Sequence, residues 1–154
     1  MMKITILALA MTTFAAPAFA ESHMAAPTGD VAGGEEQFNR QCIACHVVQD
    51  PVSGEVLAGR NAKVGPNLYG LAGRMPASVE GFNYSDALVA YGEAGAVWDQ
   101  VSFVGYVQDP TAFLREALDD NRARSKMAYQ VRDEGQATDL YAYLARFSAD
   151  AAAN

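Results

Sequence analysis

The stretch Cys42-Ile43-Ala44-Cys45-His46 decides how this chain folds. Two thiols that are separated by two residues and followed directly by an imidazole are typical of a c-type haem attachment site. In such a site the thiols add across the two vinyl groups of haem, and the imidazole of the next residue is held beneath the iron. The rest of the chain must then wrap the porphyrin and either supply a sixth ligand to the iron or leave that position open.

Three other kinds of cysteine site fit the sequence less well. A thioredoxin-like redox pair lies beside a βαβ pattern, which this sequence lacks. A structural zinc site needs four ligands, whereas the chain has two cysteines and one further histidine, His23, near the N-terminus. A disulfide between Cys42 and Cys45 stays open as an alternative, because the N-terminal segment points to an oxidising compartment. The position of His46 directly after the second cysteine favours haem attachment.

The first twenty residues have the features of a secretory signal peptide. Lys3 is followed by an apolar run and by the small-x-small end Ala18-Phe19-Ala20, which predicts cleavage after Ala20 and export to the periplasm. An uncleaved signal that anchors the chain in a membrane is the alternative. Ser22-His23-Met24 resembles a cloning scar and takes no part in the fold prediction. We expect four segments in all: a signal peptide (1–20), a flexible lead-in (21–29), one folded domain (30–148) and a C-terminal tail (149–154).

The charge balance of the chain excludes one class of partner. Lys3 is the only charged residue of the signal segment, so ten basic and eighteen acidic residues remain in the mature chain. A nucleic-acid-binding protein shows the opposite balance, and we therefore expect no nucleic-acid partner.

Apolar periodicity and capping residues predict a mostly helical domain. Asp30, Asp99 and Asp133 each precede a helical pattern and can accept hydrogen bonds from its first backbone amides. The stretch between the haem motif and residue 73 is rich in Gly and Pro, which predicts a loop without strands. The predicted helices cover 30–41, 84–92, 100–108, 111–118 and 133–147.

Two further sites follow from the haem hypothesis. A metal-bound imidazole donates its other nitrogen to an acceptor, and the carbonyl of Pro66 is a candidate for that role. A methionine as sixth ligand would raise the haem potential and leave no open position for a substrate. Met24, Met75 and Met127 are the candidates in the mature chain. Met127 is distinctive because it lies in a polar loop, although chemistry alone does not exclude Met75.

An ordered set of short motifs runs through nearly the whole mature sequence. The set comprises Gly34, Phe38, Cys42-Ile43-Ala44-Cys45-His46, Gly59-Arg60-Asn61-Ala62-Lys63, Gly65-Pro66-Asn67-Leu68-Tyr69-Gly70, Arg74, Phe82-Asn83-Tyr84-Ser85, Trp98, Tyr106-Val107-Gln108-Asp109-Pro110, Lys126-Met127 and Asp139-Leu140-Tyr141-Ala142-Tyr143-Leu144. With this set the chain resembles the class I cytochromes c, and it is most similar to the bacterial cytochrome c2 group, in the larger form with extended loops.

The resemblance implies an all-α fold in which three main helices, short helices and long loops wrap one covalently bound haem c. It implies thioether bonds at Cys42 and Cys45, and axial ligation of the iron by His46 and Met127. Gly34 and Phe38 are expected to pack against Leu140 and Tyr143, where the terminal helices cross.

The resemblance also implies the surroundings of the haem. The carbonyl of Pro66 is expected to hold the ring of His46, and the hydroxyl of Tyr106 to reach the sulfur of Met127. Arg74, Tyr84 and Trp98 should surround the haem propionates. Met75 then becomes a packing or surface residue.

The function implied is one-electron transfer, not catalysis. With both axial positions filled, the iron binds no small-molecule substrate. We expect a soluble, monomeric carrier of the periplasm that docks briefly, through its haem edge, on redox proteins such as a bc1 complex, a terminal oxidase or a photosynthetic reaction centre. The alternative is a haem with an open or labile sixth site that binds small gases or acts as a peroxidase. Such cytochrome c′-like proteins carry the haem motif near the C-terminus, whereas here it lies near the start of the mature chain.

Basic residues cluster near the two predicted ligand segments. Six of the ten in the mature chain flank Pro66 or Met127, whereas acidic residues dominate both ends of the chain. This pattern predicts a positive front that orients the approach of an acidic partner. The six are Arg60, Lys63, Arg74, Arg122, Arg124 and Lys126.

Overall fold

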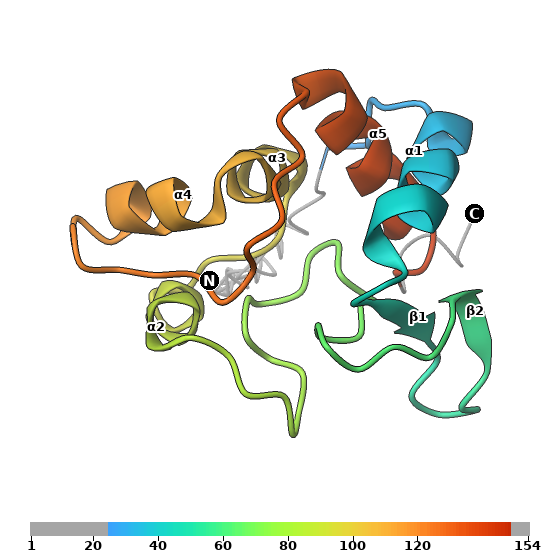
Figure 1. The fold of residues 1–154 in the computed structure, drawn as a ribbon, viewed down its shortest axis with the longest axis horizontal. Coiled ribbons are helices and arrows are strands. Elements are labelled where there is room, and N and C mark those ends of the chain that lie inside the picture. The colour runs from blue at the N-terminus through green and yellow to red at the C-terminus, as the bar shows by residue number, and fades with distance from the viewer. Residues whose placement is uncertain (1–24, 149–154) are drawn as a thin grey trace, which may run out of the picture.

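The computed structural model describes residues 25–148, and Figure 1 shows their arrangement. The predicted signal peptide, Ser22-His23-Met24 and the C-terminal tail lie outside the described residues. Among residues 25–148, no helix combines the length and the apolar character that crossing a bilayer requires.

Five α-helices, a π-helical turn and one short hairpin are joined by long loops in the described chain. The π-helix η1 continues helix α1 without a break and ends at the first cysteine of the haem motif. The elements are α1 (Val31–Gln37), η1 (Phe38–Cys42), β1 (Val47–Gln49), β2 (Val56–Gly59), α2 (Asp86–Glu93), α3 (Gln100–Gln108), α4 (Pro110–Ala117) and α5 (Glu134–Ala145).

Three helices begin at the predicted capping residues. The carboxylate of Asp30 accepts hydrogen bonds from the amides of Ala32 and Gly33. Asp99 accepts from Ser102 at 2.7 Å, and the hydroxyl of Ser102 accepts in return from the Asp99 amide. The carboxylate of Asp133 accepts from the amide of Gln136 at 2.8 Å. These bonds satisfy amides that have no partner inside the helix, so the caps fix where each helix starts.

The two terminal helices cross at Gly34, as predicted. A methyl group at Gly34 would overlap the backbone carbonyl of Asp139 and the Cβ of Tyr143. Only glycine therefore allows α1 and α5 to approach so closely. One turn later the ring of Phe38 lies 5.6 Å from that of Tyr143, and Leu140 is buried in the same core.

The prediction of a loop without strands after the haem motif was wrong over its first half. Strands β1 and β2 pair antiparallel, with Val47 opposite Gly59. The residues that predicted a loop form the turn of this hairpin: the Asp50 carboxylate accepts from the amides of Val52 and Ser53, and Gly54 has a positive φ of 75°. The strands have only three and four residues, and neither alternates between buried and exposed positions, so they give no alternating pattern in the sequence.

Aromatic side chains join α3 to its neighbours and form much of the core. The ring of Trp98 lies 5.1 Å from that of Tyr106, and the ring of Phe103 lies 5.5 Å from that of Tyr141 on α5. The hydroxyl of Tyr141 donates to the backbone carbonyl of Trp98 at 3.2 Å. This cluster anchors α3 against α5 and places Trp98 and Tyr106 on the wall of the cavity described next.

Candidate haem site

A cavity of about 670 Å³ lies between the haem motif and the segment that joins α4 to α5. Apolar side chains line most of it, among them Leu68, Leu71, Leu88, Val131, Leu140 and Leu144. All nine residues predicted from the sequence lie on its wall. They are Cys42, Cys45, His46, Pro66, Arg74, Tyr84, Trp98, Tyr106 and Met127.

The end of η1 brings both cysteines and His46 to the cavity. The amides of Cys45 and His46 both donate to the carbonyl of Cys42, at 3.1 and 2.9 Å, so the motif forms a tight turn. Both cysteines are free thiols and half-buried. Burial, and secondly the neighbouring Cys45, raises the pKa of the Cys42 thiol to about 11. The turn thus holds both thiols at the same wall of the cavity, without the disulfide that the sequence left open.

The imidazole of His46 is fixed from two sides. Its Nδ1 lies 2.9 Å from the carbonyl oxygen of Pro66, which leaves Nε2 as the nitrogen available to a metal. A methyl group at Gly65 would overlap the His46 ring, so the backbone there packs directly on the imidazole. Burial lowers the pKa of His46, although the bond to Pro66 opposes this effect. The ring is therefore neutral at pH 7, which is the state that binds iron.

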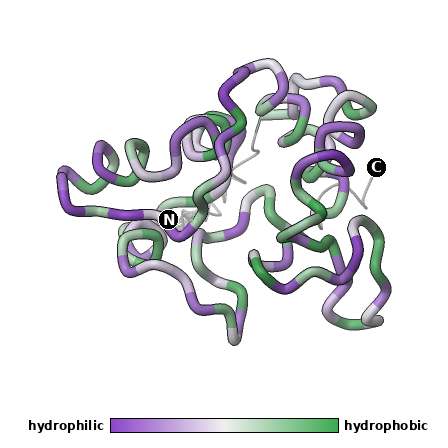
Figure 2. The backbone as a smooth tube through the Cα atoms, viewed as in Figure 1, coloured by the Kyte–Doolittle hydropathy of each residue, from purple (hydrophilic) through white to green (hydrophobic). Residues whose placement is uncertain are grey.

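Met127 reaches the cavity from an extended segment. Exposure alternates along it: Arg122, Arg124 and Lys126 point outward, whereas Ala123 is buried and Met127 is half-buried. Figure 2 shows this segment as mostly hydrophilic, so hydrophobic burial contributes little to its position. The thioether of Met127 is therefore held on the cavity wall by the residues beside it in the segment.

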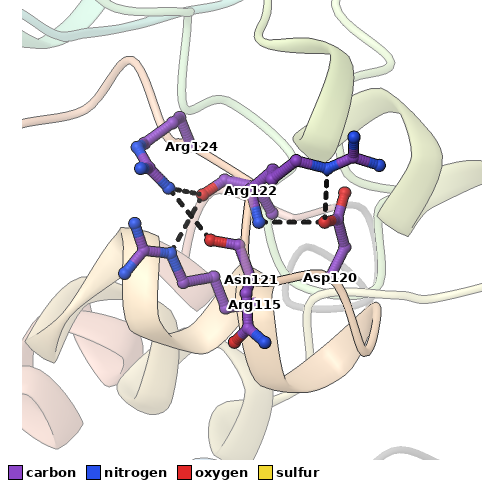
Figure 3. A network of polar contacts seen from close by, with 6 residues as sticks. Arg115, Asp120, Asn121, Arg122 and Arg124 are labelled. Atoms are coloured by element: carbon purple, nitrogen blue, oxygen red, sulfur yellow. Dashed lines mark hydrogen bonds and ion pairs between the residues drawn. The ribbon is translucent and has the colours of Figure 1, made fainter.

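Hydrogen bonds hold the segment at both of its ends. Near α4, Arg115 and Arg124 both donate to the carbonyl of Ala123, and the carboxylate of Asp120 accepts from the amide and side chain of Arg122 (Figure 3). Near Met127, the ammonium of Lys126 donates to the carbonyl and side-chain oxygens of Asn83 and to the carbonyl of Tyr84, at 2.7 to 2.9 Å.

The predicted approach of the Tyr106 hydroxyl to the Met127 sulfur stays a prediction, because this hydroxyl has another partner among the described residues. The Tyr106 hydroxyl instead lies 2.9 Å from Oγ of Ser125, and that oxygen also accepts the amide of Met127 at 3.0 Å. A hydroxyl is a better hydrogen-bond partner than a thioether, which is a weak acceptor. Burial raises the pKa of Tyr106, while its bond to Ser125 lowers it.

The predicted propionate residues line the cavity, but Arg74 is already occupied in part. Its guanidinium donates to the backbone carbonyls of Tyr69 and Asn67, while its Nε is buried without a partner among the described residues. Burial lowers the pKa of Arg74 and raises that of the Tyr84 hydroxyl. A buried cationic donor without an acceptor is costly, and a carboxylate entering the cavity would satisfy it.

These observations fit a haem. The cavity is largely apolar, a paired-thiol turn and an oriented imidazole lie on its wall, and a buried guanidinium has an unused donor. Among residues 25–148, no three His, Cys, Asp or Glu side chains gather into a group that could hold a bare metal ion. Met75 is 46% exposed and lies outside this cavity, as expected of a surface residue.

Sequence reasoning missed two positioning residues. Gly65 was interpreted only as part of a turn, because the approach of its backbone to His46 depends on how residues 59–66 return across the motif. Ser125 was not singled out, although a serine whose Oγ accepts an amide two residues later is a common turn motif. Its partner Tyr106 lies 19 residues earlier, so no local pattern could reveal that bond.

Three comparisons connect the chain to known proteins. It is 58% identical over 118 residues to cytochrome c2 of Rhodovulum adriaticum, which covers 77% of this chain and 92% of that protein. It is 49% identical over 140 residues to cytochrome c-551 of Roseobacter denitrificans, which covers 91% of each. The crystal structure of cytochrome c2 from Rhodobacter sphaeroides superposes with a TM-score of 0.75 at 43% identity, covering 79% of this chain and 98% of that one. No family model matches the chain.

Proposed function

The chain belongs to the bacterial cytochrome c2 group of class I cytochromes c, and from this premise we propose that it is a periplasmic one-electron carrier whose haem iron is held between His46 and Met127. Members of this group carry one covalently attached haem c and transfer electrons; they are not enzymes. The axial pair and the periplasmic shuttling are the parts of this proposal that go beyond membership of the group.

One observation carries the axial assignment: a single apolar cavity is lined both by the haem motif and by Met127. His46 presents Nε2 to it, because Nδ1 is engaged by Pro66. Of the two methionines among the described residues, only Met127 lies on the cavity wall, whereas Met75 is at the surface. Thioether bonds at Cys42 and Cys45 follow from the turn that holds both thiols at the same wall.

The residues that line the cavity make a bound haem suitable for outer-sphere electron transfer. When bound, the haem supplies a one-electron Fe(III)/Fe(II) couple. His46 and Met127 would hold the iron from its two sides and so exclude substrates, and a methionine ligand would favour the reduced state and a higher potential. The apolar wall keeps water from the ring, while Arg74 offers a donor to a haem carboxylate. Fixed side chains of this kind need little rearrangement when the charge on the iron changes.

The mouth of the cavity is suited to brief contact with another redox protein. Val64 and Tyr129 line the cavity and are 73% and 45% exposed, so two large side chains of its wall, which we call its rim, also face the solvent. Exposed basic residues lie beside this rim, at Lys63 and on the outer side of the Met127 segment. Arg74, which the sequence placed among the surface cations, instead points its guanidinium into the protein. The remaining cations favour an acidic partner surface, such as that of a bc1 complex, oxidase or reaction centre.

Carbon monoxide separates this function from the alternative of an open haem. We expect the ferrous holoprotein to bind no carbon monoxide at neutral pH, while a potentiometric titration follows a reversible one-electron curve. The Met127→Ala variant should bind carbon monoxide readily, and Met75→Ala should behave as wild type. Ready binding by the wild-type protein would support the gas-binding alternative and contradict the proposed function.

The salt dependence of electron transfer tests the docking surface. Rates with membranes from the source organism should fall as ionic strength rises, because salt screens the attraction between the two surfaces. Arg122→Gln should slow the reaction at low salt, whereas Glu35→Gln, an exposed change on α1, should not. Rates that are indifferent to salt would remove the argument for a basic docking front.

A further inference from the structure

A second cavity, of about 270 Å³, lies beside the cavity that fits the haem. Its walls come from strand β1, from residues 61–67 and from a turn at residues 79–82. Its polar lining residues are Gln49, Asn61, Lys63, Asn67 and Glu80. Three of these, Asn61, Lys63 and Glu80, are exposed, so the second cavity is open to solvent, unlike the largely apolar haem cavity.

The two cavities share very little wall. In the described part of the chain, only Gly65 and Phe82 line both of them. Gly65 has no side chain, and its backbone packs directly on the imidazole of His46. The ring of Phe82 is therefore the one side chain, within residues 25–148, that lies on both walls.

The local sequence holds the Phe82 ring in this place. The amide of Phe82 donates to the carbonyl of Val79 at 3.4 Å, which closes a turn, and Gly81 supplies the positive φ of 74° in that turn. The half-buried ring of Phe82 then packs edge-on against that of Tyr84, with the ring centroids 4.8 Å apart. Since Tyr84 is itself part of the haem cavity wall, this contact keeps the Phe82 ring at the boundary.

We infer that Phe82 is a partition between the two cavities, and that it tunes the haem potential by keeping the solvent of the second cavity from the haem. This inference rests on the proposed function, since it takes the larger cavity as the haem site. Solvent that reaches a haem stabilises the more highly charged Fe(III) state, so the apolar shell of the site helps to set its potential. Phe82 would act on the iron through solvent access, without being a ligand.

Removal of the ring should join the two cavities. In the Phe82→Ala holoprotein we expect the ratio of reduced to oxidised protein at a fixed potential to fall roughly three- to tenfold. A tenfold fall is a shift of about 59 mV to lower potential for one electron. The rate at which the ferric protein relaxes water protons should rise in the same variant, because water comes closer to the paramagnetic iron.

Three further variants separate the partition from a general loosening of the protein. Phe82→Leu keeps apolar bulk at the boundary, so its potential should lie between those of wild type and Phe82→Ala. Val79→Ala enlarges only the second cavity and should leave the potential unchanged. Phe147→Ala is the matched control, because Phe147 is also half-buried but lies on neither cavity wall. It should lower the unfolding free energy and leave the potential as in wild type.

The outcomes distinguish this inference from the ligand assignment beneath it. The far-red absorption band that a methionine ligand gives ferric haem should persist in Phe82→Ala. An unchanged potential or water relaxation in Phe82→Ala, an equal shift in Phe147→Ala, or loss of the band in Phe82→Ala would each overturn the partition. A band that is absent from wild type, or that survives in Met127→Ala, would instead overturn the axial assignment of the proposed function.

Discussion

The two sides of the haem cavity are built in different ways. His46 lies in a turn formed by its own neighbours, is followed at once by β1, and rests on the backbone of Gly65 and Pro66. Met127 lies in a mostly hydrophilic segment that contains no helix or strand and is held mainly by side-chain hydrogen bonds (Figures 1 and 2). The first side is fixed by main-chain geometry, and the second by a few polar side chains.

For the proposed ligands His46 and Met127, this difference predicts which bond to the iron breaks first. The amides of Cys45 and His46 bond to the carbonyl of Cys42 directly after η1, so these bonds break only when the end of η1 unfolds. The bonds of Ser125 and Lys126 can break while every helix stays intact, and segments held in this way open at low free-energy cost. We therefore expect ligand exchange, where it occurs, on the Met127 side.

The largest effect should come from Gly65, on the His46 side. In Gly65→Ala the new methyl overlaps the imidazole, so the ring must leave its bond with Pro66. We expect little or no covalently attached haem after export, measured as haem absorbance per unit of purified protein. Gly135→Ala is the control, because its methyl meets only the side chain of Asp133, at 3.2 Å. A normal haem content in Gly65→Ala would contradict the rigid attachment side.

The crossing of α1 and α5, which supports the attachment side, gives the next effect. Gly34→Ala places a methyl against backbone atoms of Asp139, and overpacking of this kind costs about 1–3 kcal/mol of unfolding free energy. Gly33→Ala, its neighbour, meets only the movable carboxylates of Asp139 and Asp30 and should gain up to about 1 kcal/mol from helix propensity. Denaturant unfolding measures both, and equal stabilities would show that the helices do not meet at Gly34.

A smaller effect is expected from Lys126, on the Met127 side. Lys126→Gln removes the ammonium that bridges to Asn83 and Tyr84, but because the side chain is exposed the loss should be about 1 kcal/mol or less. Its signature is selective: the methionine–iron absorption band should be lost at a lower temperature, while the midpoint of helix melting by circular dichroism hardly changes. If both transitions shift together, the two sides are not independent.

Alkaline pH should produce the most gradual effect. Burial raises the pKa of Tyr106 above its ordinary value of 10.0, so the folded chain holds the phenol proton more tightly than the unfolded chain does. This contribution to stability is complete below pH 10 and is lost as the pH rises through the higher folded-state value. Tyr106→Phe should flatten the fall in unfolding free energy above pH 10. If the unfolding free energy of Tyr106→Phe fell with the same slope as that of wild type, the loss above pH 10 would be due to other tyrosines. Tyr141 is one of these, because burial also raises its pKa.

The contrast between the two sides also marks how far the sequence could predict the structure. Helix starts at Asp30, Asp99 and Asp133 were predictable because a cap and its amides lie within three residues. The contact of His46 with Pro66 was predictable because imidazole ligands need a second partner.

Other features depend on tertiary contacts that no local pattern encodes. The hairpin after the motif was missed because its strands are short and do not alternate between buried and exposed positions. The bond between Tyr106 and Ser125 was not predicted because Ser125 is brought beside Tyr106 only by the packing of α3 against the Met127 segment. The resemblance to the family predicted which residues line the cavity. Most of the hydrogen bonds among these residues could be identified only from the structure.

The methyl signal of the ligated methionine tests the central claim most directly. In the reduced holoprotein with labelled methionine methyl groups, one signal should be shifted far upfield by the haem ring current. The account predicts that this signal disappears in Met127→Leu and persists in Met75→Leu. A shifted signal that survives in Met127→Leu, or its absence from the wild-type protein, would contradict a haem closed by His46 and Met127.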